Sequence, residues 1–516
     1  MEVRFYGHAC IFLKTDTVSV AVDPWFSKTG AFLSSWFQFP DNTDLDLNPI
    51  RNSDFIVLSH EHQDHVDVEF LKTIHPKTKI VIPKFTDSYL YNLLKDSLPN
   101  EVHVLNSREK MQISPDVSLC LIIQSIPIWD DCSVVLETPE GTILDVNDMK
   151  ITGPDLKWVR ENFQIKYLFM QFAPSAWHPY VYNYDNARKS STLRHKTLTR
   201  FGYARDILLA SGAERFIPSA GPPCFLDPNQ LEDAFLDEHV FSALPKFYQF
   251  AQEQGFAGKI SILFPGDKLI PDHADHEDLN QQILQKDAYA RTRQYLNDYS
   301  KRRASYITAE LEKIKSPGRS LLEKCKKHFE PLITGSPYFQ KKIHGKLLLD
   351  ITGEFPEQIL IDFSKPSNQV KLYDSEEASW TFQIESRFLD LILEGKLTWE
   401  EILLSRRIRA SRNPDIYNEF LIVFLRFRDR NSFQAYEKWD RYNSPEETFS
   451  LNYENQKYRV QRYCPHARGD LSKGRIVNGE LVCPGHGWTF SLSDGNCKQS
   501  KCSIKIEQFQ ELIRFD

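Results

Sequence analysis

The sequence lacks any apolar run as long as a membrane-spanning helix, and its basic residues are dispersed rather than gathered in blocks. A helix that crosses a bilayer takes about 20 consecutive, mainly apolar residues. The net charge is −7, which makes nucleic acid a poor partner. The N-terminus starts with a charged strand pattern instead of a signal peptide. We therefore expect a cytoplasmic protein with no membrane span and no nucleic-acid partner.

Cysteine is sparse as well, with nine residues scattered along a chain of 516. Without a secretory signal, this usage indicates reduced thiols rather than a disulfide framework. The sequence also contains no internal repeat and no low-complexity linker. A hydrophobic content of 41% and an aromatic content of 13% are ample for buried cores, which excludes extensive disorder. At this length we expect two to four closely packed domains.

Two short cysteine–histidine motifs lie near the C-terminus. Cys464-Pro-His466 is followed by Cys483-Pro-Gly-His486. Two thiolates and two imidazoles in this spacing suit a Rieske [2Fe–2S] cluster, in which cysteines hold one iron and histidines hold the other. Because such a cluster transfers single electrons, the motif indicates a redox protein.

A zinc site with two cysteines and two histidines is the alternative interpretation. Classical zinc fingers keep the cysteine pair and the histidine pair in separate arms, whereas each arm here mixes the two. Residues 485–490 resemble the second loop of Rieske oxygenases and Rieske ferredoxins. Rieske proteins of respiratory complexes carry an extra cysteine in each loop, and the corresponding places here are Arg468 and Gly485. The resemblance is therefore to the oxygenase or ferredoxin class.

A histidine-rich loop near the N-terminus directly follows an apolar strand pattern. Residues 55–58 predict a buried strand, and the next seven residues include His60, His62, Asp64 and His65. This H-x-H-x-D-H string resembles the metal-binding loop of the metallo-β-lactamase superfamily. Three imidazoles and a carboxylate suit zinc, iron or manganese, and the ligands alone do not choose among these metals.

A further ligand is expected where a predicted hairpin ends. Residues 7–13 and 18–22 predict one hairpin, and residues 133–146, with a turn at 139–141, predict another. In the metallo-β-lactamase superfamily a carboxylate after such a strand bridges two metals. The resemblance therefore implies that Asp148 has this role, with Asp145 as the fallback. We expect Asp64, His65 and Asp148 to be the catalytic members of the site.

Two places depart from the superfamily pattern. Many members have a further histidine before the second hairpin, but residues 127–131 contain none, so that stretch offers only Asp130 or Asp131 as a substitute. Many members also have a late ligand histidine. Here a predicted strand at 215–218 leads to Asp227, which is either the replacement ligand or an ordinary loop carboxylate.

The expected fold class is α+β with several domains. Residues 1–270 are expected to form an αββα sandwich of the metallo-β-lactamase type, and residues 271–429 a helical and α+β middle region. Residues 388–398 weakly resemble the sterol-carrier-type fold, although plain scaffolding is the simpler interpretation. Residues 430–516 are expected to form a small all-β Rieske domain.

Together these parts resemble the CMP-N-acetylneuraminate hydroxylase family, which combines a Rieske centre with a metallo-β-lactamase-like domain. The resemblance includes residues 23–26, 30–32, 59–65, 172–176 and 412–417. That family carries its Rieske domain at the N-terminus, whereas the cluster motif is C-terminal here. The different order suggests a sister family and leaves the substrate open.

The resemblance implies a monooxygenase. A reductase, ferredoxin or cytochrome would reduce the cluster, which would pass electrons to one or two irons in the N-terminal loop. There O₂ would hydroxylate a small polar metabolite bearing an amino, N-acyl or nucleotide group. Zinc has no redox chemistry and would leave the cluster without a use, and manganese is a further option. A homo-oligomer would be required if the cluster could not reach the metal within one chain.

Three other functions remain open. A metallohydrolase would use zinc to activate a water molecule, and its Rieske domain would be accessory. A reductase of O₂ or NO is disfavoured by His62, because flavodiiron proteins have a glutamate in that place. A non-enzymatic electron carrier would require vestigial N-terminal ligands, yet all four are present. No D-x-x-H-x₄-H pattern of ordinary Rieske oxygenases is found elsewhere in the sequence.

Overall fold

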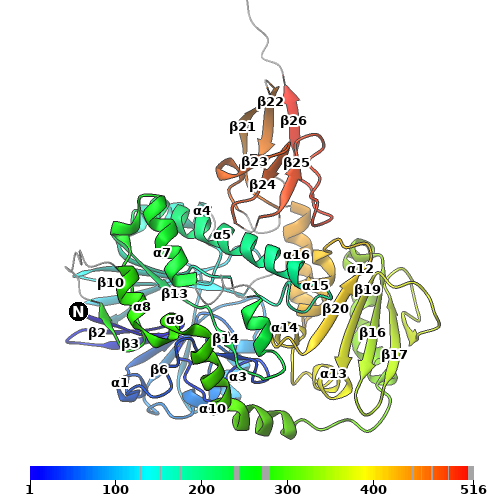
Figure 1. The fold of residues 1–516 in the computed structure, drawn as a ribbon, viewed down its shortest axis with the longest axis horizontal. Coiled ribbons are helices and arrows are strands. Elements are labelled where there is room, and N and C mark those ends of the chain that lie inside the picture. Colours follow the sequence, from blue (N-terminus) through cyan, green and yellow to red (C-terminus); the bar gives the residue numbers. More distant parts are fainter. Residues whose placement is uncertain are drawn as a thin grey trace, which may run out of the picture.

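The chain folds into three parts that follow one another in sequence (Figure 1). The computed structural model describes residues 1–127, 130–151, 153–174, 176–236, 243–269, 279–442, 447–454, 456–465, 469–485 and 487–509. No helix in these ranges is both long and apolar enough to cross a membrane.

Two sheets packed face to face form the N-terminal part. The first has the order β15 (Lys268–Leu269), β1 (Glu2–Gly7), β2 (Cys10–Lys14), β3 (Ser19–Val22), β5 (Phe55–Val57), β6 (Lys79–Pro83) and β7 (Val102–Leu105). The second has the order β13 (Arg215–Ser219), β12 (Ile165–Gln171), β11 (Gly141–Asn147), β10 (Cys132–Thr138), β9 (Val117–Ile123) and β8 (Lys110–Ser114). Both inner faces are apolar, as in Val20, Val57, Val134 and Phe169, and these side chains form one core between the sheets.

Helices cover both outer faces and complete the expected αββα sandwich, which confirms the fold class. The first sheet carries α1 (Asn48–Arg51), α2 (Val68–Leu71) and α3 (Tyr89–Ser97). The second carries α4 (Gly153–Asn162), α5 (Asn186–Ser211), α7 (Ala243–Glu253) and α8 (Leu279–Gln285), with η2 (Ala257–Lys259) close to α7. Parallel strands such as β3, β5 and β6 are buried on both faces, which explains their continuous apolar sequences.

The long helix α5 has clear signals at both ends. The Asp185 carboxylate accepts a hydrogen bond from the backbone N–H of Arg188 at 2.7 Å and caps the first turn. Gly212 follows the last turn with φ of 73°, a left-handed conformation that glycine adopts without steric cost. The helix runs beneath the C-terminal part of the chain (Figure 1).

A second aromatic core joins the sandwich to the helices that follow it. It includes Trp36 and Phe225 from the short strands β4 (Trp36–Phe37) and β14 (Cys224–Phe225), and Tyr299 from α10 (Thr292–Lys313). The short elements η1 (Leu231–Phe235) and α9 (Asp287–Ala290) lie beside them. Residues 279–311 therefore pack against the N-terminal sandwich.

The middle part is a five-stranded sheet with helices. The strand order is β18 (Val370–Leu372), β17 (Glu357–Asp362), β16 (Lys346–Thr352), β19 (Trp380–Glu385) and β20 (Ile408–Arg412). The helices are α11 (Leu322–Gly335), α12 (Pro337–Ile343), α13 (Ser386–Leu393), α14 (Trp399–Leu404), α15 (Glu419–Arg426) and α16 (Arg430–Tyr442). The indole N–H of Trp36 donates to the Leu404 carbonyl at 2.8 Å, so the end of α14 contacts the sandwich directly.

The C-terminal part consists of two three-stranded sheets around a small core. One has the order β21 (Thr448–Tyr453), β22 (Gln456–Gln461) and β26 (Ile506–Phe509), and the other β23 (Arg475–Val477), β24 (Glu480–Val482) and β25 (Thr489–Ser491). The turn η3 (Leu471–Lys473) lies between β22 and β23 in sequence. This part stands above α4, α5 and α16 (Figure 1).

One predicted strand begins later than the sequence pattern indicates. Residues 7–13 were expected to be extended, but β1 ends at Gly7 and β2 begins at Cys10. His8 lies in the turn between them with φ of 52°, in the left-handed region. This turn places His8 at the edge of the sheet, beside the loop that follows β5.

Candidate metal centre and cluster site

The loop after β5 brings its histidines together. The His60 Nε2 and His62 Nδ1 atoms lie 2.9 Å apart. Two nitrogen ligands at about 2.1 Å from one metal, at right angles, would be about 3.0 Å apart. The spacing of these two nitrogens therefore matches that of two ligands on one metal ion.

Two of the three groups with metal-ligand geometry among the described residues adjoin each other at His65. His60, His65 and Asp148 make one, and His8, Asp64 and His65 make the other. The His65 Nε2 atom lies 3.5 Å from Asp148 Oδ1 and 3.6 Å from Asp64 Oδ2. His65 Nε2, Asp64 Oδ1 and Asp148 Oδ1 are buried and have no hydrogen-bond partner in the described part of the chain. Buried polar atoms are seldom left unpaired, so this donor set fits a bound cation.

Asp23 fixes the orientation of His65. Its Oδ2 atom lies 2.9 Å from His65 Nδ1, and it also accepts hydrogen bonds from the Ser59 hydroxyl at 2.5 Å and from the Asn147 amide. A carboxylate acceptor keeps the proton on Nδ1 and leaves Nε2 free to ligate a metal. Asp23 has φ of 43°, in the left-handed region, so the backbone is strained where it holds the site.

His62 is held from the middle part of the chain. The Glu400 Oε2 atom, in the first turn of α14, lies 3.4 Å from His62 Nε2, and Arg426 pairs with the other carboxylate oxygen at 2.9 Å. The neighbouring Glu401 accepts a hydrogen bond from the Gln63 amide at 2.6 Å. The loop of residues 59–65, called the metal loop below, therefore contacts the N-terminus of α14.

The carboxylates of the site stabilise positive charge on its histidine rings. Burial alone would lower the pKa of His65, but Asp148 and Asp64 raise it to about 10. Burial would likewise raise the pKa of Asp64, yet the imidazoles of His65 and His8 hold it well below its usual range. Imidazolium and a metal cation compete for the same position, so a metal would displace the protons from these rings.

The other predicted carboxylates are placed differently. Asp131 Oδ1 lies 3.7 Å from His60 Nε2, which puts it beside the metal loop where the superfamily histidine is missing. Asp130 instead groups with Glu61 and Asp87. Asp145 accepts a hydrogen bond from the Asn147 backbone N–H at 3.1 Å and belongs to none of the three metal groups of the described residues.

Asp227 is not brought to the metal loop. Its Oδ2 atom pairs with the Arg407 guanidinium at 2.7 Å, and its Oδ1 atom accepts from the backbone N–H of Asn229 at 2.9 Å. The Arg407 guanidinium therefore neutralises the Asp227 carboxylate in place of a metal ion. Among the described residues, Asp227 belongs to neither metal group.

Sequence reasoning missed His8, Asp23 and Glu400. His8 Nε2 lies 3.0 Å from Asp64 Oδ2, but a single histidine in a predicted hairpin carries no spacing signal. Asp23 precedes a proline at the end of a strand, and this position could have marked it as a site residue. Glu400 comes from another part of the fold and has no local signal.

The cluster motifs lie in two loops of the C-terminal part. Cys464 and Cys483 are both fully buried. A Cβ atom on Gly469 would lie 2.8 Å from the Cys483 sulfur, so the first loop passes that sulfur so closely that only glycine fits. Two buried thiols in closely packed loops fit the cysteine side of an iron–sulfur cluster. The predicted ligands His466 and His486 lie outside the described residues.

The second cluster loop contacts α5 of the sandwich. The Gly487 carbonyl lies 3.3 Å from His195 Nε2, and the ring of Trp488 packs edge-on against Tyr417 at 5.4 Å between centroids. The first loop also approaches the sandwich, since a Cβ on Gly153 would lie 3.1 Å from the Tyr463 ring. Both loops therefore face the N-terminal part within the same chain.

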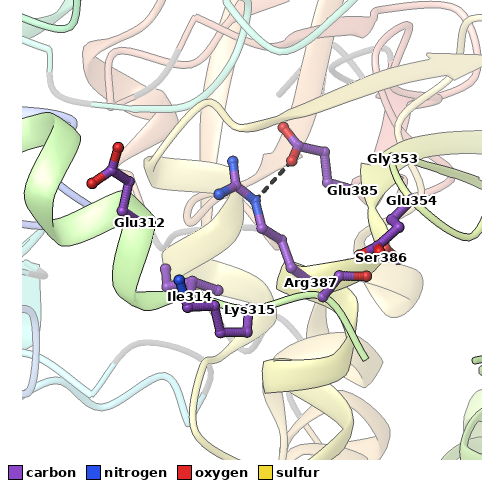
Figure 2. A pocket seen from close by; sticks show the side chains of 9 residues that line it. Glu312, Ile314, Lys315, Gly353, Glu354, Glu385, Ser386 and Arg387 are labelled. Atoms are coloured by element: carbon purple, nitrogen blue, oxygen red, sulfur yellow. Dashed lines mark hydrogen bonds and ion pairs between the residues drawn. The ribbon is translucent and has the colours of Figure 1, made fainter. Parts of the chain in front are cut away.

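A separate hollow lies between the end of α10 and the start of α13 (Figure 2). Glu312, Lys315, Glu385 and Arg387 line it, and Arg387 Nε donates to Glu385 Oε2 at 2.8 Å. No histidine or cysteine is found among the described residues that line it. It therefore offers no soft metal ligand and is not part of the metal centre.

Three families match successive parts of the chain. The family described as a beta-lactamase superfamily domain matches residues 2–134. The family described as an Rv3818-like, SCP2-like domain matches residues 321–442, and the Rieske [2Fe-2S] domain family matches residues 439–510.

Relatives that match almost the whole chain occur in mycobacteria, where they are provisionally named Rieske 2Fe-2S iron-sulfur proteins. The one from Mycolicibacterium smegmatis is 28% identical over 97% of this chain and 98% of its own length. The one from Mycobacterium tuberculosis is 29% identical over 96% of this chain and 98% of its own length. A cytidine monophosphate-N-acetylneuraminic acid hydroxylase from Asterias rubens is 22% identical over 26% of this chain and 21% of its own length. The chain thus joins a metallo-β-lactamase-like N-terminal domain to a C-terminal Rieske [2Fe–2S] domain, and it is related to Rieske proteins that include a CMP-N-acetylneuraminate hydroxylase.

Proposed function

We propose that the chain is a Rieske-type non-heme iron monooxygenase that hydroxylates a small polar metabolite. The observation that carries this proposal is the contact between Gly487 and His195, which sets the second cluster loop against α5 of the metal-binding domain. Five residues further along α5, Arg200 donates to the backbone carbonyl of Asp148 at 3.4 Å. A single helix therefore links the cluster domain to the predicted metal centre.

The residues around the metal centre would have separate roles. His60, His62, Asp64, His65 and Asp148 would hold the metal, with His8 and Asp131 close enough to take part. Asp23 keeps the proton of His65 on Nδ1, and Glu400 holds His62 from the opposite side. Bound iron would supply the O₂ chemistry, and the Rieske cluster would supply single electrons. Burial of His60, Asp64 and His65 limits the access of bulk water.

Electrons must come from a partner, because a Rieske domain exchanges single electrons with a redox protein. We propose a reductase, ferredoxin or cytochrome as the donor and the cytoplasm as the location. The substrate that we propose bears an amino, N-acyl or nucleotide group. The charged residues around the centre support a polar substrate over a lipid.

Metal analysis combined with electron paramagnetic resonance on anaerobically purified protein tests the proposal. We expect iron beyond the two atoms of the cluster, and a reduced Rieske signal. With a competent reductase, the protein should consume O₂ in the presence of a suitable amino, N-acyl or nucleotide-linked metabolite. Zinc in the N-terminal site, with no O₂ uptake across such a panel, would instead support the metallohydrolase.

A further inference from the structure

Three basic side chains lie where the cluster domain meets the metal-binding domain. Lys196 directly follows His195, the α5 residue that contacts the second cluster loop, and Arg200 is one turn further on. Lys150 lies two residues after Asp148 and just before α4, whose first residue Gly153 approaches Tyr463. Lys196 and Arg200 are thus on α5, which contacts both the second cluster loop and Asp148, and Lys150 precedes α4; both helices lie beneath the C-terminal part (Figure 1).

Arg200 is buried without a full set of partners. Only 6% of its surface is exposed. Its Nη2 atom donates to the Asp148 carbonyl and to the Gln171 side chain, but Nε and Nη1 have no hydrogen-bond partner in the described part of the chain. Leaving donors of a buried guanidinium unpaired is costly, which points to a ligand that would accept from them.

Lys196 has only a neutral acceptor. Its Nζ atom donates to the backbone carbonyl of His178 at 2.8 Å. Burial and the nearby charge of Lys150 lower the pKa of Lys196 to about 7. Within the described ranges, neither Lys196 nor Arg200 forms an ion pair with a carboxylate. Lys196 and Arg200 are therefore left without a carboxylate partner in the described part of the chain.

The carboxylates around the metal loop have other partners. Asp64 and Asp148 face His65, Asp131 faces His60, and Asp23 and Glu400 contact His65 and His62. None of these carboxylate side chains accepts from the unpaired donors of Arg200 in the described part of the chain. An anion that accepts from Nε and Nη1 of Arg200 would form charge-assisted hydrogen bonds with them.

We propose that Arg200 and Lys196, together with Lys150, bind an anionic group of the substrate, either a carboxylate or a phosphate. This inference extends the proposed function and depends on it, because the anion is a substrate group only if the protein is the proposed monooxygenase. The anion would lie between the cluster loops and the metal centre, so that the carbon to be hydroxylated is held beside the metal. Arg200 can bind both carboxylates and phosphates through two parallel hydrogen bonds.

The test is calorimetric titration of the metal-loaded, oxidised full-length protein with inorganic phosphate and, separately, with acetate. Arg200→Gln and Lys196→Gln are compared with Arg194→Gln, a matched control because Arg194 is exposed on the same helix. We expect saturable binding of at least one anion, weakened at least ten-fold in both test variants and unchanged in the control. Preference for phosphate or for acetate identifies the anionic group.

Two results would overturn the inference. One is that neither anion binds saturably to the wild-type protein. The other is that both test variants bind as the wild-type protein does, which would leave the basic residues only a screening role beside the cluster. Cluster absorption and iron content establish that each variant is folded, and Lys196→Gln, at a half-buried position, provides the second variant if Arg200→Gln does not fold.

The titration is independent of turnover. Anion binding without O₂ consumption would refute the monooxygenase while leaving the anion site in place. O₂ consumption without anion binding would refute the anion site alone. Line broadening of the phosphate phosphorus resonance after reduction of the cluster would place the bound anion near the paramagnetic centre, whereas an unaffected line would place it elsewhere and overturn the assignment.

Discussion

The Glu400 carboxylate lies 3.4 Å from His62 Nε2, although the two residues come from different domains. Arg426 pairs with the same carboxylate at 2.9 Å, which fixes its position. Interaction with Glu400 raises the pKa of His62 to about 9, even though burial alone would lower it. The SCP2-like domain therefore contributes directly to the predicted metal centre. Carboxylates that contact a ligand histidine orient the ring and increase its basicity.

We predict that Glu400→Gln weakens metal binding at the N-terminal site. Loss of a carboxylate behind a ligand histidine typically costs about 10–100-fold in metal affinity. Competition with a chelator, followed by metal analysis, measures the effect. Glu354→Gln, at an exposed position in the same domain, is the control and should retain the metal. Equal retention by both variants would show that Glu400 has no such role.

We predict that the two metal sites are lost independently. Cys464→Ser should abolish the visible absorption of the cluster but keep the N-terminal metal, because the thiolate is predicted to be a ligand of the cluster alone. His60→Ala should lose that metal and any hydroxylation while keeping the Rieske spectrum. Absorption spectra with metal analysis of both variants check this. A full cluster spectrum in Cys464→Ser, or unchanged metal content and turnover in His60→Ala, would contradict the assignments.

Electron transfer is expected within one chain. Gly487 and Tyr463, which flank the cluster loops, approach His195 and Gly153 of the same chain. A mixture of Cys464→Ser and His60→Ala chains should therefore recover no hydroxylation. Native mass spectrometry must show whether mixed dimers form. Recovered activity would mean that a neighbouring chain supplies the cluster.

Stability should depend on pH through Glu419, at the start of α15. Burial and the charge of Asp440 raise its pKa from 4.5 to about 7, although Lys342 opposes the shift. A carboxyl whose pKa is higher in the folded state takes up protons on folding, so stability falls between about pH 4.5 and 7 and stays lower above that range. Glu419→Gln should therefore stabilise the protein by up to about 3 kcal/mol above pH 8 and by little at pH 4.5. Denaturant unfolding at both pH values tests the sign, and equal effects at both would contradict it.

The metal loop could be predicted from the sequence because its ligands are close together and follow a buried strand. His60, His62, Asp64 and His65 span six residues, so the spacing alone carries the signal. Asp148 could be predicted as a candidate for a related reason, since a hairpin pattern ends just before it. The structure places it 3.5 Å from His65 Nε2, and its role as a ligand stays a prediction.

Residues that reach the site through tertiary packing could not be found in this way. Glu400 is separated from His62 by most of two domains, and only the docking of α14 brings it there. The pairing of Asp227 with Arg407 is also a tertiary contact, because the guanidinium comes from the loop before β20. The ligand roles of Cys464 and Cys483 remain predictions from their spacing.

The pairing of β1 with β15 has a consequence for the order of events during synthesis. Val3 pairs with Leu269, so the first sheet is complete only after residue 269 has left the ribosome. At ~5–20 residues per second, the stretch after Asp148 takes roughly 6–24 s to be translated. The nascent ligands would spend that time beside an unfinished sheet edge, so stable metal loading would follow the release of β15.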